Sequence, residues 1–413
     1  MAEHRRGANL PSIGGFNRTV VLDAVRRSPD GLSRVELASR TGLSAQTVSN
    51  VTRFLIEAGM IAESGTIVSG RGKPRTILRL EAASRYAVGV HVDPAVVTYV
   101  LLDLAGTVVA STTTSTPTAD DPSEVVRTIA TAIDGLVRDA EVDTDAVLGV
   151  GIASPGPIDV DAGVVLDPPF LPRWRDVPLR DALSEATGYP VLLEKDVTAA
   201  VVGEMFLAGE SSARNFAFVY FGTGFGVGLV VDHEPVRGVG SNAGDAGHIM
   251  VDQGALAGTP DSAGTRGEVG AAVAPDRLVQ IARDRGLPLD APSDVESVDR
   301  AWDGLAAAID AGDPVAIGLA EDAGTVMGNA VVLIVNLLDI DRVVFGGPFW
   351  SRVASAALPA ARAAIVESPL LVPKHPVVVD ESDRGADVAA VGAACLVLDA
   401  ALSPRASALL IRR

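Results

Sequence analysis

Apolar and polar positions recur with a helical period over residues 33–57, which predicts two helices joined by a tight turn. Ser33 and, three residues later, Glu36 form a capping box, so we expect a helix to begin there. Gly42 permits the left-handed backbone that a sharp turn needs, and Ser44 can cap the second helix. This arrangement is typical of a helix-turn-helix.

The second of these helices separates an apolar face from a polar one. Val48, Val51 and Leu55 recur at helical spacing and are expected to pack inward. The opposite face carries polar side chains: Gln46, Ser49, Asn50 and Arg53. Short amide and hydroxyl groups with one arginine suit hydrogen bonding to base edges and phosphates in a major groove. An ordinary solvated helix face is the alternative interpretation.

A basic hairpin is expected after the second helix. Its tip, in SGRGKPRTILRL, places Arg71, Lys73 and Arg75 among glycines and a proline, where cations can reach a phosphate backbone or a minor groove. Two helices followed by such a hairpin indicate a winged helix-turn-helix, which we expect over residues 1–80. The residues expected to bind DNA are Ser44, Gln46, Thr47, Ser49, Asn50, Arg53, Arg71, Lys73 and Arg75.

The distribution of charge supports a division of the chain. Residues 1–80 carry 12 Lys or Arg against 6 Asp or Glu, a balance of +6, whereas the remainder carries 22 against 46, a balance of −24. The whole chain of 413 residues has a net charge of −18, which would argue against nucleic acid in a single-domain protein. A basic module on an acidic body resolves this conflict, because the body repels DNA and leaves the module to face it.

Cysteine usage and hydropathy narrow the class of protein further. Cys395, the only cysteine, lies in the apolar run VAAVGAACLVLDAAL and is expected to be a buried structural thiol, which excludes an internal disulfide framework or a thiolate zinc site. The N-terminus lacks an apolar signal region, and no uninterrupted apolar stretch approaches the roughly 20 residues that span a bilayer. We therefore expect a cytoplasmic, nucleoid-associated protein that does not bind membranes.

Beyond Leu80 the pattern changes to alternating strands and helices. The expected strands are 86–93, 98–104, 106–115, 147–153, 191–194 and two within 215–232, and the expected helices are 121–141, 179–187 and 197–208. Alternation of this kind predicts an α/β architecture with largely buried sheets, and its approximate repetition suggests two related lobes.

The order of these pieces resembles the ROK family of repressors, open reading frames and sugar kinases, and in particular its regulators with an N-terminal winged helix. The motifs that carry the resemblance are SRVELASRTGLSAQTVSN, GRGKP, GIASPGPID, PPFLPRWRDVPL, EKDVTAAVVGE, FGTGFGVGLVV, NAGDAGH and VVFGG. The resemblance implies a two-lobed, actin-like (ribonuclease H-like) ATPase-type domain with a sugar cleft between its lobes. We expect a first lobe over 81–195 and a second over 196–413, with the C-terminal helix packing back on the first.

Two loops of the family's kinases bind phosphate, and the first departs from the family pattern here. In place of the family's D-x-G-G-T the chain reads HVDPAVV, so His91 stands at the aspartate position and Asp93-Pro94 replaces the glycine pair. This change removes an amide donor and adds a negative charge, and we expect the loop to be lost. The second loop, Gly222–Gly226, is intact, although backbone packing explains a glycine-rich turn equally well.

The sugar-site motifs are partly kept. In the family's E-N-D-A-N the aspartate is the catalytic base, and here Asp196 is retained while Lys195 replaces the first asparagine. Asp196 can also cap the helix that follows it, and both roles can hold at once. Lys195 raises the idea of a phosphorylated or acidic sugar, with pairing to Glu194 or Glu204 as the alternative.

The motif A-G-E-I-G-H appears as AGDAGH, so Asp245 replaces the sugar-binding glutamate and His248 remains. In the family this histidine often ligates a structural zinc with three cysteines, but the segment GALAGTPDSAGTRGEVG has none, so we expect no metal. Its later glutamate, which contacts the sugar in relatives, aligns with Gly270. His248 is therefore either a ligand contact or a packed histidine, and for Trp174 core packing is favoured over a cleft wall. The expected effector-binding residues are Lys195, Asp196, Asp245 and His248.

Asp196 without the first phosphate loop is a base with no phosphoryl donor, so we expect no enzyme activity and no cofactor. The sequence predicts a sequence-specific DNA-binding transcriptional regulator, a repressor, that binds a double-stranded operator as a homodimer or homotetramer and senses a sugar or sugar derivative. A sugar kinase with a DNA-binding extension and a constitutive DNA-binding protein without an effector are the alternatives.

Overall fold

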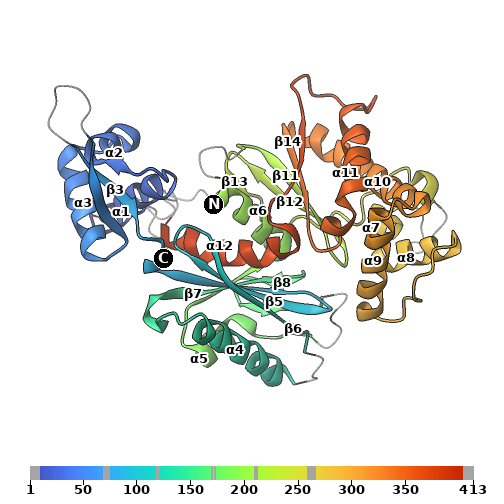
Figure 1. The fold of residues 1–413 in the computed structure, drawn as a ribbon, viewed down its shortest axis with the longest axis horizontal. Coiled ribbons are helices and arrows are strands. Elements are labelled where there is room, and N and C mark those ends of the chain that lie inside the picture. Colours follow the sequence, from blue (N-terminus) through green and yellow to red (C-terminus); the bar gives the residue numbers. More distant parts are fainter. Residues whose placement is uncertain are drawn as a thin grey trace, which may run out of the picture.

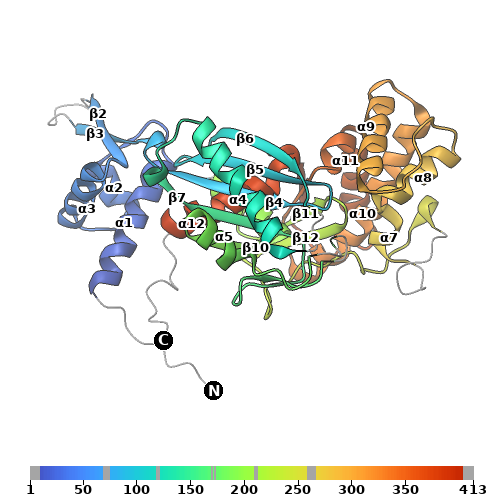
Figure 2. The ribbon, with the colours of Figure 1, turned by 90° about the horizontal axis from the view of Figure 1, so that it is seen from below.

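The computed structural model describes residues 10–67, 75–117, 121–168, 171, 174–208, 213–257 and 267–402. An N-terminal helical module is followed by two α/β halves, each built on a five-stranded sheet (Figures 1 and 2). The module stands at one end of an elongated molecule, and helices α7–α11 lie at the other end (Figure 1).

The N-terminal module contains three helices and a small sheet of strand order β1-β3-β2. Its elements are α1 (Leu10–Arg26), β1 (Leu32–Ser33), α2 (Arg34–Thr41), α3 (Ala45–Glu57), β2 (Ile61–Ile67) and β3 (Arg75–Leu80). Ser33 and Glu36 form the expected capping box, and Gly42 ends α2 in the left-handed conformation at φ 68°. The predicted helix-turn-helix with its wing strands is confirmed, whereas α1 was not predicted.

The first α/β half has the strand order β10-β7-β4-β5-β6. Its elements are β4 (Tyr86–Val92), β5 (Val96–Asp103), β6 (Val108–Ser115), α4 (Pro122–Asp139), β7 (Val147–Ser154), α5 (Leu179–Thr187) and β10 (Val191–Lys195), with a small β8 (Ile158–Asp159) and β9 (Val164–Val165) hairpin. Strands β4, β5 and β6 are antiparallel neighbours, and β7 and β10 add in parallel.

The second half has the strand order β13-β12-β11-β14-β15. Its strands are β11 (Phe216–Phe221), β12 (Phe225–Val231), β13 (Glu234–Pro235), β14 (Arg342–Gly346) and β15 (Val378–Glu381). Its helices are α6 (Asp196–Leu207), α7 (Val269–Val273), α8 (Pro275–Asp284), α9 (Val295–Asp310), α10 (Pro314–Leu338), α11 (Trp350–Val366) and α12 (Val388–Leu402). Strands β11–β13 are antiparallel and β14 and β15 add in parallel, which repeats the pattern of the first half.

Three apolar layers hold these elements together. Helices α4 and α5 cover the outer face of the first sheet, α7–α11 cover the outer face of the second, and α6 with α12 pack together between the sheets. The middle layer needs glycine, because a Cβ at Gly89 would lie 2.0 Å from the oxygen of Ala390 and one at Gly151 would lie 1.8 Å from that of Ala393. Cys395 is fully buried in α12, and burial raises the pKa of its thiol to about 12.

The N-terminal module is fixed to this middle layer. Arg26, at the end of α1, donates through Nη1 to the Phe206 oxygen at 2.9 Å and lies 3.8 Å above the Phe206 ring. Asp23 accepts from the same guanidinium at 2.7 Å. Val21, Leu22 and Val25 of α1 belong to the same buried cluster as α6 and α12. Burial lowers the pKa of Arg26, although an arginine remains charged.

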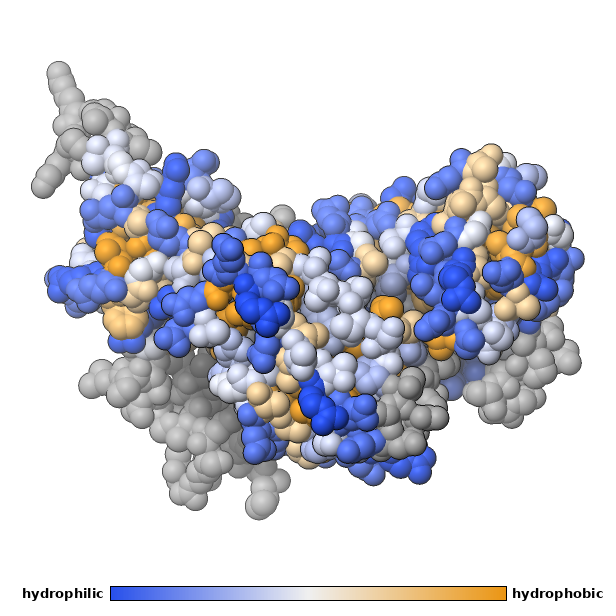
Figure 3. Space-filling model, turned by 60° about the horizontal axis from the view of Figure 1, so that its bottom comes forward, coloured by the Kyte–Doolittle hydropathy of each residue, from blue (hydrophilic) through white to orange (hydrophobic). Residues whose placement is uncertain are grey.

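One helix of the described residues, α10, is long and apolar enough to cross a membrane. It packs against α11, and 56% of its most apolar window is buried inside the protein, as in the core helix of a globular domain. The face of the molecule in Figure 3 shows hydrophilic side chains with smaller apolar groups between them.

Candidate functional site

The first candidate site is the outward face of α3. Ser44 caps this helix by accepting from the amide of Thr47 at 3.1 Å, and Val48, Val51 and Leu55 are buried as predicted. The side chains of Gln46 and Asn50 are exposed and joined by a 3.1 Å hydrogen bond from Nε2 to Oδ1.

The other described residues expected to bind DNA lie on α3 and at the start of β3. Arg53 is exposed, Ser49 and Thr47 are half-buried, and Arg75 is exposed at the start of β3. Arg71 and Lys73 lie outside the described residues. The helix therefore presents amide, hydroxyl and guanidinium groups in one row, which is a chemical set that can bond to base edges and phosphates.

Residues that the sequence did not single out brace this face. The guanidinium of Arg34 donates to Oγ1 of the buried Thr52 at 3.1 Å and to Glu63 at 2.9 Å, and it thus joins α2, α3 and β2. Arg18 of α1 lies 3.8 Å from the ring of Phe54, which is exposed on α3. These contacts fix the orientation of α3 relative to its neighbours.

The second candidate site is a cleft of about 350 Å³ between the two sheets. Its polar lining comes from four separate segments: His91, Asp93, Lys195, Asp196, Tyr220, Asn242 and Asp245. Residues 155–157 and 223–226 also line the cleft. Three of the four expected effector-binding residues, Lys195, Asp196 and Asp245, are thus brought together.

His248 does not line this cleft. Its side chain is 66% exposed, and Nδ1 lies 2.9 Å from Oε1 of Glu268. The sequence comparison aligned the family's glutamate with Gly270, and the carboxylate that contacts His248 belongs to Glu268, two residues earlier.

Two buried carboxylates give the cleft its electrostatic character. Burial raises the pKa of Asp93 to about 6, and its Oδ1 accepts from the amide of Ala95 at 3.0 Å. Burial likewise raises the pKa of Asp196 to about 6, partly offset by the nearby Lys195. Burial lowers the pKa of His91 to about 4, so this imidazole is neutral at pH 7, and its Nε2 lies 3.4 Å from the Tyr220 hydroxyl.

The position of Asp196 resolves the question of helix capping. Helix α6 begins at Asp196, with Lys195 at the N-cap position and no side-chain capping bond. Within the part of the chain that the structure describes, Asp196 Oδ1 accepts from the next amide, that of Val197, at 2.7 Å. The capping interpretation is therefore wrong in its usual form.

Lys195 pairs with neither of the residues named as alternatives. Its Nζ donates to the main-chain oxygen of Asn242 at 3.2 Å. Glu194 instead pairs with Arg237 at 2.6 Å, and Glu204 bonds to the hydroxyl of Ser382. Trp174 is buried and its Nε1 donates to the Pro117 oxygen at 3.1 Å, which agrees with the core interpretation.

The glycine-rich turn at 222–226 has a packing role. A Cβ at Gly226 would lie 2.6 Å from Cγ1 of Val197, and one at Gly228 would lie 2.3 Å from the Val197 oxygen. These glycines let strand β12 approach the first turn of α6. Close packing therefore accounts for Gly226 and Gly228.

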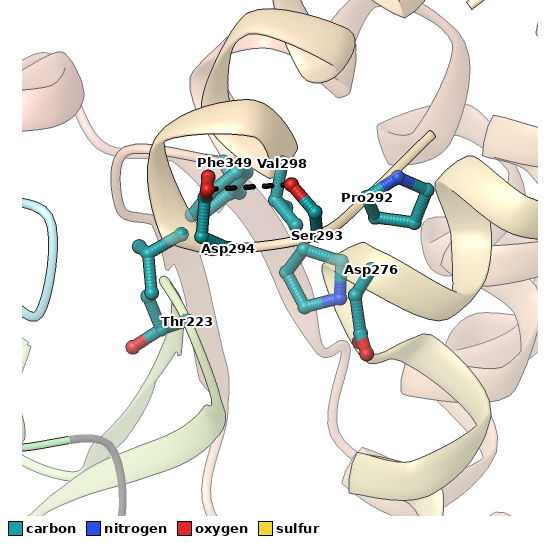
Figure 4. Close-up of a pocket in the computed structure, with 9 residues that line it drawn as sticks. Thr223, Asp276, Pro292, Ser293, Asp294, Val298 and Phe349 are labelled. Carbon is teal, nitrogen blue, oxygen red and sulfur yellow. Dashed lines mark hydrogen bonds between the residues drawn. The ribbon is translucent and has the colours of Figure 1, made fainter. Parts of the chain in front are cut away.

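A second, more apolar cavity of about 260 Å³ lies next to the cleft and shares Thr223 with it. Figure 4 shows Phe349, Val298 and Pro292 around it, with Asp276 and the hydrogen-bonded pair Ser293 and Asp294 at its rim. The described lining residues include two carboxylates, Asp276 and Asp294.

No group of three or more His, Cys, Asp or Glu suited to a metal ion occurs among the residues that the structure describes. The cleft offers carboxylate oxygens, which accept hydrogen bonds from hydroxyl groups, and one ammonium group. Its chemistry fits a small polar molecule.

Comparisons with known proteins agree with this architecture. The chain is 28% identical to the xylose repressor of Bacillus subtilis over 63% of this chain and 66% of that protein. It is 24% identical to the DNA-binding transcriptional repressor Mlc of Escherichia coli over 89% of both chains. The crystal structure of a ROK family transcriptional regulator, a homologue of E. coli Mlc, superposes with a TM-score of 0.73 at 22% identity, covering 95% of this chain and 98% of that one.

Glucokinases also match the chain. The alignments span 54–66% of the length of several curated relatives. The fold is thus a winged helix-turn-helix followed by an actin-like ATPase domain. Since residues 87–400 match the family's profile, this chain belongs to the ROK family.

Proposed function

We propose that this protein is a sequence-specific DNA-binding transcriptional repressor whose ROK domain is a sugar-responsive, non-catalytic effector domain. The observation that carries this proposal is the row of exposed Gln46, Asn50 and Arg53 on α3 of a winged helix. Relatives named as repressors support it. In this proposal α3 enters the major groove, Ser44, Thr47 and Ser49 contact bases or phosphates nearby, and the wing with Arg71, Lys73 and Arg75 holds the backbone.

The operator is double-stranded and palindromic in this proposal, because two copies of one module bind with two-fold symmetry. The protein acts as a homodimer or homotetramer in the cytoplasm, on the nucleoid. The body, with its balance of −24, repels the duplex and leaves the winged helix to face it.

The effector is a sugar or sugar derivative that enters the cleft. Asp196 and Asp245 accept its hydroxyl hydrogens there, and no cofactor takes part. Lys195 is engaged by Asn242 and shares the cleft lining with three aspartates, Asp93, Asp196 and Asp245, so the field in the cleft favours a neutral sugar over an anionic one. His248, with Glu268, stands outside the lining and acts on the ligand only if the two halves move.

Helix α6 is the element that connects the two sites. It begins at Asp196 in the cleft and ends at Leu207, next to Phe206, whose oxygen and ring contact Arg26 of the winged helix. A ligand that shifts α6 therefore shifts the module. A coupling of this kind typically changes affinity by about 1–3 kcal/mol.

Genomic footprinting with the full-length protein tests the DNA-binding proposal. Wild type is expected to enrich a palindromic motif, and Asn50→Ala with Arg53→Ala is expected to bind that motif about 10-fold or more weaker, since each lost base contact costs about 1–3 kcal/mol. Arg138→Ala, an exposed arginine on α4, is the matched charge control. Enrichment of random sequence by wild type would refute sequence-specific binding.

A thermal-shift and calorimetry panel of sugars, amino sugars and sugar phosphates tests the effector proposal. Neutral sugars are expected to stabilise wild type, and Asp196→Asn is expected to weaken them. Stabilisation only by sugar phosphates, lost in Lys195→Ala, would instead assign Lys195 to an anionic ligand. No stabilisation by any compound would favour a constitutive DNA-binding protein.

A sugar kinase with a DNA-binding extension is the second candidate, because Asp196 is retained and glucokinases are among the relatives. It requires ATP consumption in the presence of a sugar, abolished by Asp196→Asn. The carboxylate of Asp93 in the first phosphate loop argues against this activity.

A further inference from the structure

The side chain of Asn242, which lines the cleft, joins the two α/β halves. Asn242 lies in the loop after β13, and Ile158 lies in β8, which follows strand β7 of the first sheet. Asn242 Oδ1 accepts from the Ile158 amide at 2.8 Å, and Asn242 Nδ2 donates to the Ile158 oxygen at 2.7 Å. The side-chain amide thus pairs with one residue's backbone as a neighbouring strand would.

A second bond crosses at the same place. Lys195, the last residue of β10 in the first sheet, donates from Nζ to the main-chain oxygen of Asn242 at 3.2 Å. Lys195 is only 7% exposed, so its ammonium group is held here and not in bulk solvent. Asn242 is therefore bound through both its side chain and its backbone.

The turn between these partners has no spare room. A Cβ at Gly156 would lie 3.1 Å from Asn242 Oδ1 and 3.2 Å from Lys195 Cε. Contacts this short oblige a neighbour to move by a few tenths of an ångström. Glycine at this position lets the Gly156-Pro157 turn lie against both side chains.

We propose that Asn242 and Lys195 form a clasp that holds the two halves closed over the cleft through the protein's own hydrogen bonds. Opening the cleft requires the release of Asn242 from Ile158. The clasp uses Lys195 for closure, so this lysine sets the position of the lobes before it can contact any ligand. The clasp contributes three hydrogen bonds at Asn242, next to the Glu194–Arg237 ion pair that also joins the two halves.

Distance measurements between two spin labels test this proposal. Thr131 on α4 and Ala307 on α9 are exposed and lie in different halves, so the pair Thr131→Cys and Ala307→Cys reports their separation (Figure 1). The native Cys395 is fully buried, so we expect that the spin label does not react with it in the folded protein. We expect one narrow distance distribution in the doubly labelled parent.

Asn242→Ala is expected to add a population at longer distance. Asn336→Ala is the matched control, because the Asn336 side chain also makes two backbone hydrogen bonds, to Leu370 and Val372, and both lie within the second half. The control is expected to leave the distribution unchanged. An unchanged distribution in Asn242→Ala would overturn the clasp.

Two further variants keep the test decisive if Asn242→Ala folds poorly. Asn242→Asp retains an oxygen for the Ile158 amide but places a second oxygen against the Ile158 carbonyl, and Gly156→Ala adds a methyl group against the clasp. Both are expected to lengthen the distance. If both fold with the parent distribution, the clasp does not control opening.

Discussion

The outward face of α3 and the cleft are both polar, but they are assembled in opposite ways. The polar groups of α3 come from one stretch of 13 residues and face solvent. The groups of the cleft come from segments as distant as His91 and Asp245, and several are desolvated. The comparison teaches that the first site depends on one helix and its caps, whereas the second depends on how two sheets are held.

The largest expected effect lies at the junction of these two regions. Arg26→Ala removes a cation that is 4% exposed, together with its packing on the Phe206 ring and the donor to the Phe206 oxygen, and leaves Asp23 with Arg27 alone. We therefore expect the free energy of unfolding to fall by about 3–5 kcal/mol. Chemical denaturation measures this loss. Arg138→Ala, whose pair with Asp139 is exposed, should change stability by less than about 1 kcal/mol. Equal losses in both variants would show that the junction is not specially stabilised.

The next largest effect concerns the stability that the buried carboxyl group of Asp93 costs the cleft. The folded-state pKa of Asp93 is raised to about 6 from an ordinary 3.8, so folding prefers the protonated acid and loses stability as the pH rises from about 4 to above 6. Asp93→Asn keeps an oxygen for the Ala95 amide and should stabilise the protein at pH 7.5 by up to about 3 kcal/mol. The gain should disappear near pH 4.

Denaturation at pH 7.5 and pH 4 checks this prediction. Asp103→Asn is the control, because Asp103 Oδ1 accepts hydrogen bonds from the backbone amides of Ala105 and Thr107 in a similar turn. We expect no stabilisation from this control. A stabilisation by Asp93→Asn that is the same at both pH values would contradict the electrostatic origin.

The smallest expected effect concerns helix α3, which carries the first candidate site. Ser44→Ala removes the N-cap of α3, which should cost about 1 kcal/mol of stability. Thermal denaturation measures this loss, and Ser44→Asp should restore most of it. Ser355→Ala, at an exposed position inside α11, serves as a control away from any N-cap position. If Ser44→Ala leaves the midpoint unchanged, the cap does not stabilise α3.

The sequence predicted what local signals determine. The capping box at Ser33, the turn at Gly42 and the apolar spacing of α3 specified the helix-turn-helix before any tertiary contact was considered. Alternating strands and helices likewise predicted the α/β halves. Helix α1 was missed, although Val21 and Val25 have helical spacing and are buried.

Long-range partners could not be predicted in the same way. The bond from Arg26 to Phe206 joins residues 180 positions apart, and that from Asn242 to Ile158 joins residues 84 positions apart. Nothing in either local sequence specifies the other. The pairing of Lys195 with a main-chain oxygen also lay beyond reasoning from charge, because a carbonyl is present at every residue.

The anchoring of α1 against α6 and α12 has an evolutionary consequence. A DNA-binding domain on a flexible linker can be exchanged between proteins without regard to the domain that follows it. In this protein Arg26 of the N-terminal module packs into the interior of the α/β halves. If the module were joined at residue 80 to another domain, the Arg26 guanidinium would lose its contacts with Phe206. The N-terminal module and the α/β halves are therefore expected to have diverged together. A substitution near Phe206 would limit which N-terminal modules can still pack against it.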